Sequence, residues 1–370
     1  MIINIYFIYS YLNSFSDILH LSSIFLSSSH SFFPFIKPKP IKFKYLSRLL
    51  SSIKEYGKPL EKGRDWANGD PDLVLNPWWV TGITDGEGSF YVSMIKSCTL
   101  SNVRGHKITV TFKIDQKEDS AGILYDLSRF FECGTVIVDN RGYKSYKVSN
   151  IDLIINHILP HFDKYPLITS KQLNYLSFKS IVKLLKNKEH LTNDGLNKIK
   201  EIRNTMNSRR TFLEKWIYLN SINNRVLDPH WLQAFIDGEG SFQFGIATRI
   251  SRGRPYMATT PTMEIGQNTH DVIVLKWIKE YFEAGYLKPK FDISNIEEVL
   301  SVRGVSRYIL RDSDLIISFV DKYPMLTRKQ EDFLIWKKIV QLKKERAFDT
   351  EEGLNMMKTL KATMNSGKYK

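Results

Sequence analysis

The sequence holds only two cysteines, Cys98 and Cys133, among its 370 residues. Two thiols cannot build a zinc finger or a disulfide framework. No Gly-Lys-Ser/Thr triplet follows a glycine-rich stretch, which excludes a P-loop, and the alternating acids of an EF-hand loop and a nucleophile elbow are missing too. Beyond residue 40, no charge-free run reaches the length of a membrane span. The common nucleotide, calcium and hydrolase signatures are therefore excluded.

Acidic residues are also in short supply. The chain has 39 Asp and Glu against 53 Lys and Arg, which leaves a formal charge of +14. This surplus favours polyanions as partners over acidic substrates. With 42% hydrophobic and 13% aromatic residues, a chain of this length can bury the cores of about two domains. We therefore expect a basic, globular protein that binds nucleic acid.

The first forty residues differ in composition from the rest of the chain. They hold nine serines, six phenylalanines and three charged residues, and they end in the Lys-Pro pairs at 37–40. The stretch from Met1 to Leu26 is apolar, but polar residues interrupt it and no arginine-rich targeting face appears. We predict a poorly ordered leader over residues 1–75, with a membrane anchor as the alternative.

An internal repeat organises the chain from residue 76 onward. The segment NPWWVTGITDGEGSF at 76–90 recurs as DPHWLQAFIDGEGSF at 228–242, and eight of the fifteen positions are identical. The tetrapeptide DKYP and the tripeptide TMN recur downstream in the same order. We therefore predict an N-terminal repeat at 76–207 and a C-terminal repeat at 228–366, joined by a linker at 208–227.

Each repeat has the same predicted order of elements. An N-cap residue, Asn76 or Asp228, and a proline at the first helical position open a helix of about ten residues. A period of two then predicts strands, and further amphipathic patterns predict helices. The fold class is α+β, with two pseudo-symmetric αββαββα repeats. The first repeat shows strands near 90–94 and 107–114, a second hairpin over 135–148, and helices near 118–132 and 169–188; the second shows helices near 270–283 and 327–346.

Small residues recur on each opening helix. Gly82 and Gly86 are four residues apart, and Ala234 and Gly238 occupy the matching places in the second repeat. A stripe without side-chain bulk lets two helices approach backbone to backbone. Because glycine in a helix costs up to about 1 kcal/mol relative to alanine, its presence calls for a packing reason. We predict that these four residues form an interface between the two helices.

Each opening helix ends in Asp-Gly-Glu-Gly, which places Glu87 and Glu239 where the two helices are predicted to touch. Two unpaired carboxylates would repel each other. Divalent cations bound between them and a phosphate remove that conflict and can activate water. Magnesium suits so sparse a site of oxygen ligands. One such motif is typical of a helix C-terminus with an acidic turn, but two in the same context indicate a shared metal site.

With these motifs, V-T-G-I-T-D-G-E-G at 80–88 and L-Q-A-F-I-D-G-E-G at 232–240, the sequence resembles the LAGLIDADG homing endonucleases in their single-chain, two-motif form. The resemblance covers about residues 76–365. It implies that the motif helices form the interface, that saddle-shaped antiparallel sheets lie along the DNA major groove, and that Glu87 and Glu239 bind catalytic Mg²⁺ or Mn²⁺. Glutamate replaces the aspartate of the family name at both sites and keeps a carboxylate there.

The resemblance also implies residues near the cleaved phosphates. A polar residue ends the second strand of each repeat, and the candidates are Gln116 and Gln267; ordinary solvent-facing polarity is the alternative for this pair. A lysine begins a late helix, and the candidates are Lys171 and Lys329. A neighbouring position could serve instead, as Arg328 beside Lys329 shows.

The residues around each acid complete the predicted site. Gly86 and Gly238, which precede the acids, are assigned to the metal sites with them. Asp85 and Asp237 are interpreted as structural residues that satisfy backbone or partner groups at the helix ends.

DNA contacts are expected from the polar faces of the strands and from arginine-rich loops. Because the two repeats diverge on these faces, the target should be an asymmetric duplex site of about 20 base pairs, or two helical turns. The candidates in the first repeat are Ser93, Lys107, Thr109, Thr111, Lys113, Arg141, Ser145 and Lys147, and those in the second are Arg249, Arg252, Arg254, Arg303 and Arg307.

The predicted function is a site-specific, metal-dependent double-strand DNA endonuclease that acts as a monomer on duplex DNA. The main alternative is an RNA maturase, which would make host-intron RNA a further partner; a DNA-binding regulator is a more distant one. The presence of both Glu87 and Glu239 favours the nuclease, because binding alone does not require paired carboxylates. No membrane partner is expected. The family's occurrence in organellar introns places the protein in the mitochondrion, with the chloroplast as the alternative.

Overall fold

The computed structural model describes residues 64–96, 106–139, 142–222, 225–302 and 304–365. They belong to one compact unit that begins at Arg64. The predicted leader up to residue 63 and two of the predicted DNA-binding residues, Arg141 and Arg303, lie outside the described residues. Within the described part of the chain, no helix combines the length and the apolar character needed to cross a membrane.

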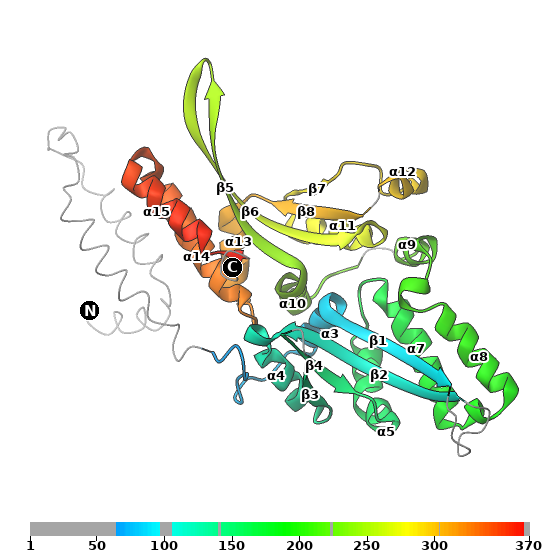
Figure 1. Ribbon diagram of the computed structural model, residues 1–370. Helices are drawn as coiled ribbons and strands as arrows, with labels where there is room; N and C mark the ends of the chain where they lie inside the picture. The colour runs from blue at the N-terminus through cyan, green and yellow to red at the C-terminus, as the bar shows by residue number, and fades with distance from the viewer. Residues whose placement is uncertain (1–63, 97–105, 140–141, 223–224, 303, 366–370) are drawn as a thin grey trace, which may run out of the picture. The chain divides into compact units, whose positions relative to one another are not determined.

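The unit contains two repeats of the predicted αββαββα order (Figure 1). The first repeat consists of α3 (Pro77–Glu87), β1 (Gly88–Lys96), β2 (His106–Lys117), α4 (Gly122–Phe131), β3 (Thr135–Asp139), β4 (Tyr143–Val148), α5 (Ile151–Leu153), the short π-helix η3 (Ile154–Ile158), α6 (Leu159–Lys164), α7 (Lys171–Lys186) and α8 (Asn193–Asn204). The second consists of α10 (Pro229–Glu239), β5 (Gly240–Ser251), β6 (Arg254–Asn268), α11 (Val272–Phe282), β7 (Tyr286–Lys288), α12 (Ile296–Ser301), β8 (Val305–Leu310), α13 (Ser313–Lys322), α14 (Lys329–Lys344) and α15 (Glu351–Ala362). Helix α9 (Phe212–Asn220) lies between them, and single 3-10 turns follow β2 (η2, Glu118–Ser120) and β6 (η6, Thr269–Asp271).

The opening helices begin where their caps predict. The Asn76 side chain accepts a hydrogen bond from the Trp78 N–H at 2.9 Å, and Asp228 accepts one from the His230 N–H at 2.8 Å. Each helix has proline at its start, where a missing N–H leaves no bond unmade. Each ends at a glutamate, because the next residue is a glycine in extended conformation that begins a strand.

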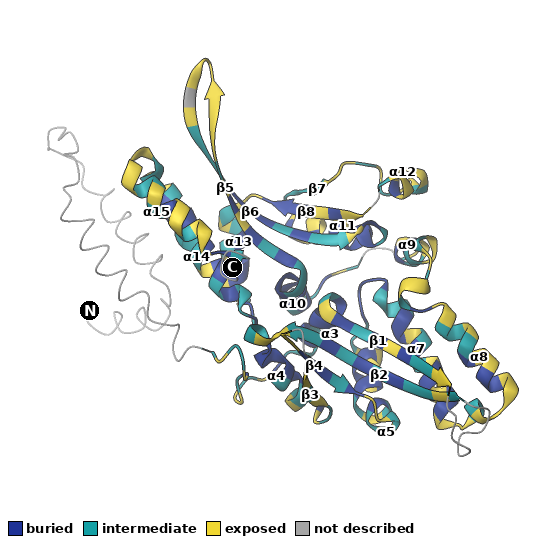
Figure 2. Ribbon diagram, in the orientation of Figure 1, coloured by how far each residue is buried: buried dark blue, intermediate teal, exposed yellow. Residues whose placement is uncertain are grey.

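Each repeat has one four-stranded antiparallel sheet, with the orders β1-β2-β4-β3 and β5-β6-β8-β7. The predicted pairing in the first repeat is confirmed: Phe90 lies opposite Phe112, and Val92 opposite Val110. Those side chains are buried against the helices, whereas the residues between them point to the other face of the sheet. Figure 2 shows this alternation along β1 and β2. Each repeat therefore buries its own core under one face of its sheet and leaves the other face polar.

The second repeat departs from the first in two places. Its first hairpin has strands of 12 and 15 residues, which turn at Arg252 and Gly253, both with positive φ. Helix α12 is inserted between the last two strands, a feature that the sequence patterns did not predict.

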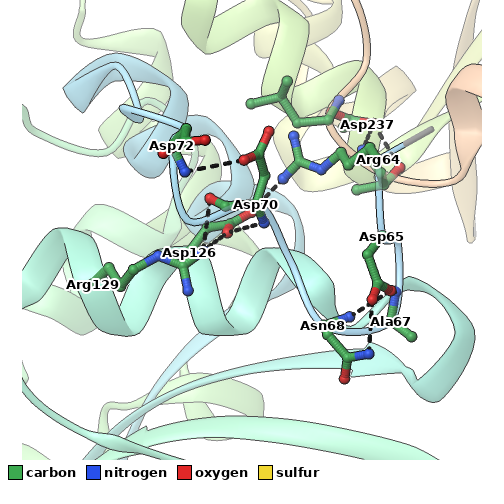
Figure 3. Close-up of polar contacts among 11 residues, drawn as sticks. Arg64, Asp65, Ala67, Asn68, Asp70, Asp72, Asp126, Arg129 and Asp237 are labelled. Carbon is green, nitrogen blue, oxygen red and sulfur yellow. Dashed lines mark hydrogen bonds and ion pairs between the residues drawn. The ribbon is translucent and has the colours of Figure 1, made fainter. Parts of the chain in front are cut away.

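The end of the predicted leader needs correcting, because residues 64–75 pack against α4. Figure 3 shows the buried Asp126 carboxylate between the guanidinium groups of Arg64 and Arg129. Asp126 also accepts the Asp70 N–H at 3.0 Å, and the Gly122 N–H donates to the Trp66 carbonyl at 2.6 Å. We call residues 64–75 the N-terminal strap, since they belong structurally to the first repeat.

The predicted linker at 208–227 contains helix α9. Its Trp216 and Leu219 are buried in the core of the second repeat. The segment is therefore folded against that repeat as well as connecting the two. The other predicted boundaries of the two repeats, 76–207 and 228–366, remain a proposal.

Candidate active site

The two opening helices pack against each other through their small residues. A Cβ placed on Gly82 would lie 2.4 Å from the Trp231 carbonyl oxygen and 2.8 Å from the Ala234 Cβ. A Cβ on Gly86 would lie 3.5 Å from the Gly238 Cα. The structure thus brings all four predicted interface residues together, with backbone facing backbone.

This packing places the two acids side by side. Glu87 is the last residue of α3 and Glu239 the last of α10. A Cβ on Gly86 would come within 3.7 Å of the Glu239 Cγ, and one on Gly238 within 3.7 Å of the Glu87 Cγ. Each acid therefore leaves its own helix directly beside the glycine of the other.

Two open cavities lie at these helix ends, one for each acid. The cavity at Glu87 has a volume of about 340 Å³ and is also lined by Gln116, Arg328 and Lys329. We call it the Glu87 half-site. The cavity at Glu239, the Glu239 half-site, has a volume of about 400 Å³ and is also lined by Gln267, Glu264 and Arg307. The structure thus brings both predicted glutamines to the acids of their own repeats.

The surroundings of the acids disfavour two full negative charges. Burial by the surrounding protein raises the pKa of the Glu87 carboxyl, and the neighbouring charge of Glu239 raises it further, although the Glu87 side chain opens to solvent. Burial also raises the pKa of Glu239, against a hydrogen bond from Gln267 that favours its ionised form. A bound cation would relieve both the repulsion and the loss of hydration.

Lys171 and Lys329 lie at the C-terminal ends of the opening helices. The Lys171 Nζ donates to the carbonyls of Thr84 at 2.9 Å and Gly86 at 3.2 Å. The Lys329 Nζ donates to the equivalent carbonyls, Ile236 at 3.0 Å and Gly238 at 3.1 Å. A cation at this end of a helix is stabilised by the helix dipole.

These contacts concern two predictions from the sequence: the lysines near the acids, and the assignment of Gly86 and Gly238 to the metal sites. Burial lowers the pKa of both lysines, and the carboxylates nearby counteract that shift. The carbonyls of Gly86 and Gly238, assigned from sequence to the metal sites, each accept one hydrogen bond from a lysine. A carbonyl oxygen has two lone pairs, so one remains for a metal ion.

The aspartates beside the acids hold the architecture of the site, as interpreted from the sequence. Asp85 accepts hydrogen bonds from the Ile168 N–H at 2.8 Å, from the Thr169 hydroxyl at 2.6 Å and, across the interface, from the Trp231 Nε1 at 2.8 Å. Asp237 accepts the equivalent bonds within its own repeat, from residues 326 and 327. These bonds tie each opening helix to the turn that precedes α7 or α14.

The predicted DNA-binding residues of the first repeat share one face of its sheet. In the strand register, Ser93 lies opposite Thr109, and Lys113 lies opposite Lys147. Lys107, Thr111 and Ser145 follow at positions of the same parity, on the face away from the core. Ser145 is buried, and its hydroxyl donates to the Asp115 carboxylate, which makes it less accessible than the sequence predicted.

In the second repeat the arginines are more widely spread. Arg249 and Arg254 lie on the polar face near the tip of the long hairpin, and Arg252 lies in its turn. Arg307 lies on the same face of β8, close to Glu239.

The sequence interpretation named Arg328 only as an alternative to Lys329, and its side chain lines the Glu87 half-site. Its Nη1 donates to Asp119 of the first repeat at 3.0 Å, and its Nε donates to Glu331 at 3.1 Å. The sequence feature that pointed to Arg328 was its position directly before Lys329, because the first repeat has Ser170 at the equivalent position.

A family model described as LAGLIDADG endonuclease matches residues 80–182 and 232–340. The chain belongs to the LAGLIDADG endonuclease family. Both matched segments begin in an opening helix, and each contains the acid and the lysine of its repeat. The LAGLIDADG motif helices are therefore α3 and α10.

Relatives of this LAGLIDADG protein occur in fungi. Probable intron-encoded endonuclease 3 of Neurospora crassa is 28% identical over 326 residues, which cover 84% of this chain and 58% of the relative. An uncharacterized mitochondrial protein, RF1, of Saccharomyces cerevisiae is 25% identical over 312 residues, which cover 79% of this chain and 60% of the relative. This chain thus spans less than two thirds of the length of these relatives.

Solved LAGLIDADG structures are similar over both repeats. The structure of I-SmaMI bound to cleaved DNA has a TM-score of 0.68 and 30% identity, covering 81% of this chain and 99% of that one. I-SmaMI bound to an uncleaved DNA target in the presence of calcium ions has a TM-score of 0.67 and 28% identity, covering 79% and 99%. Both structures contain two repeats within a single chain, as this protein does.

Proposed function

We propose that this protein is a site-specific double-strand DNA endonuclease that uses Mg²⁺ or Mn²⁺ at Glu87 and Glu239. The observation that carries the proposal is the meeting of the two acids at the ends of α3 and α10, each beside the glycine of the other helix. The solved structures of I-SmaMI support it, because they hold that protein bound to an uncleaved DNA target in the presence of calcium ions and bound to cleaved DNA.

The donor set fits a divalent cation of the magnesium class. Among the described residues, no group of three or more His, Cys, Asp and Glu side chains could hold a metal ion by itself. Two carboxylates with raised pKa values and a cluster of oxygen ligands suit an ion that keeps several waters and takes phosphate oxygens as further ligands. When bound there, such an ion would activate water and stabilise the charge that develops on the cleaved phosphate.

The other groups at the site act by orientation and charge. Gln116 and Gln267 can each orient a water or a phosphate oxygen, since an amide both donates and accepts hydrogen bonds. Lys171 and Lys329 hold the helix ends that carry the acids and place two cations within reach of negative charge. The polar sheet faces with Lys113, Lys147 and Arg249 supply contacts to a duplex.

The remaining proposals follow from the same residues. Two divergent faces on one chain fit a monomer that binds an asymmetric target of about 20 base pairs. Paired acids favour a nuclease over an RNA maturase, because RNA binding does not require them. The mitochondrion is the proposed location, which the mitochondrial relative in Saccharomyces cerevisiae supports.

Single substitutions of the acids test the proposal. A target is first selected by cleavage from a pool of randomised duplexes with purified protein and Mg²⁺. Glu87→Gln or Glu239→Gln should then abolish double-strand cleavage while leaving target binding largely intact, because the amide keeps the shape but not the charge. The matched control is Glu352→Gln on the exposed surface of α15, which should cleave like the wild type. Full cleavage by either active-site variant, or wild-type cleavage without a divalent ion, would contradict the proposal.

A further inference from the structure

The two half-sites have equivalent acids and glutamines but differ in their arginines. Equivalent positions follow from the strand registers and from the order of the late helices. Arg328 precedes Lys329 as Ser170 precedes Lys171. Arg307 lies opposite Gly266 as Ser145 lies opposite Asp115. Each arginine thus stands where the other repeat has a serine.

Arg328 enters the Glu87 half-site from the second repeat. It lies at the N-cap of α14, its side chain is 31% exposed, and it lines the same cavity as Glu87 and Gln116. Asp119 of the first repeat holds the guanidinium from one side and Glu331 from the other. Because carboxylates on two different elements bond it, the side chain is oriented before any substrate binds.

Its counterpart, Ser170, brings no cation to the Glu239 half-site. Ser170 is buried, and its backbone N–H donates to Asp271 of the other repeat at 3.3 Å. Both contacts join the start of a late helix to the turn after the second strand of the other repeat. In one contact the half-buried guanidinium of Arg328 bonds to an aspartate, and in the other the buried backbone N–H of Ser170 does so.

In the Glu239 half-site the arginine is Arg307, which comes from strand β8 and not from the start of a late helix. It is exposed on β8 and lines the cavity with Glu239, Gln267 and Glu264. At the equivalent place in the first repeat, the Ser145 hydroxyl is bonded to Asp115 and is buried. Each half-site therefore has one arginine at its mouth, and the two approach from non-equivalent directions.

We propose that Arg328 and Arg307 are phosphate-positioning residues, each serving the scissile phosphate of one DNA strand. This inference rests on the proposed nuclease function and adds that each half-site positions the phosphate of a different strand. A guanidinium binds phosphate oxygens with two parallel N–H groups, so a fixed arginine at each cavity orients the phosphate as well as attracting it. The chemistry on the two strands then depends on different residues and can be slowed separately.

Strand-resolved kinetics test the inference. A duplex target carries a different label on each strand, and the cleavage rate of each strand is followed under single-turnover conditions with Mg²⁺. Arg328→Ser should slow one strand by about 10- to 100-fold, the range for losing a charged hydrogen-bond donor, and leave the other within about twofold. Arg307→Ser should slow the opposite strand. Arg328→Lys should recover part of the loss, because it restores the charge but not the fork.

Two controls separate this role from a structural one. Arg346→Ser removes one exposed positive charge elsewhere and should leave both strand rates unchanged. Melting temperatures report whether loss of the Arg328–Asp119 pair loosens the contact between the repeats. Equal slowing of both strands by Arg328→Ser, slowing of the same strand by both variants, or no slowing would overturn the inference. Failure of the wild type to cut either strand would instead overturn the proposed function.

Discussion

Gly82 faces the Trp231 carbonyl across the helix interface, whereas Gly86 faces the Cα of Gly238. A methyl group at position 82 would lie 2.4 Å from a backbone oxygen, which cannot move without moving the helix. At position 86 the nearest atom would be at 3.5 Å, an ordinary contact distance. The helices are therefore closest one turn before the acids, and the space beside the acids is less restricted.

This difference predicts that the same substitution has a large effect on stability at one place in the helix and a small effect at another. Gly82→Ala should destabilise the protein by about 1–3 kcal/mol, because overpacking outweighs the gain of about 1 kcal/mol in helix propensity. Gly86→Ala, the matched control, should change stability by less than about 1 kcal/mol. Chemical denaturation of both variants measures the difference. Equal stability of the two would contradict the close approach at Gly82.

Whether the sequence predicts a contact in this site depends on how far apart the two residues lie along the chain. Helix ends and strand faces follow from local patterns, so the place of Glu87 could be predicted from caps and spacing. The glutamines and the lysines came from the family resemblance. Arg328 and Asp119 are 209 residues apart in sequence, and no local periodicity carries that information. Ser145 was placed on the correct face, but its bond to Asp115 depends on the neighbouring strand.

At the scale of elements, the recurring TMN tripeptide has a structural role that its sequence did not reveal. Asn207 and Asn365 both adopt a left-handed backbone conformation, with φ of 55° and 52°. The Asn207 side chain donates to the Phe90 carbonyl at 3.0 Å, and Asn365 donates to the Phe242 carbonyl at 2.9 Å. Each asparagine thus ties the end of a helix to the outer edge of the strand that follows the acid. An edge strand gains a partner by this contact.

The contact between η6 and the start of α7 makes stability depend on pH. Burial raises the pKa of Asp271 to about 6, although Ser170 donates to it and Lys215 lies nearby. An unfolded aspartate titrates near 3.9. Between these values the folded state binds the proton and the unfolded state does not, so the contribution to stability is full below about pH 4 and is lost as the pH rises to about 6.

Asp271→Asn should remove this dependence. The wild type should lose about 2–3 kcal/mol relative to the variant between pH 4 and pH 6, since one pKa unit corresponds to about 1.4 kcal/mol. The amide oxygen still accepts the Ser170 N–H, so the contact itself is kept. Denaturant unfolding of both proteins across this pH range measures the difference. A constant difference would show that Asp271 ionises in the folded state as it does in the unfolded chain.

At the scale of the whole molecule, the N-terminal strap joins the first repeat through one buried carboxylate. The Asp126 side chain is fully buried, and its carboxylate forms ion pairs with Arg64 of the strap and with Arg129 of α4. Removing one partner of a buried pair leaves an uncompensated charge, which costs more than the pair itself contributes. The strap and α4 should therefore lose their packing together.

We expect Asp126→Asn to destabilise the protein by about 3–5 kcal/mol. The matched control is Asp152→Asn, which breaks the exposed pair with Lys186 and should cost at most about 1 kcal/mol. Thermal unfolding of the full chain compares them. If both substitutions have the same small effect, the strap does not contribute to the stability of the first repeat.

The packing of α3 on α10 also has a consequence during synthesis of the protein, because the ribosome makes the two helices at different times. The two helices begin 152 residues apart, at Pro77 and Pro229. A ribosome that adds about 5–20 residues per second finishes the second helix roughly 8–30 seconds after the first. For that time the small-residue stripe of α3 has no partner in the growing chain. A ribosome that stalls before residue 228 would thus leave a half-molecule free to pair with another nascent copy of itself.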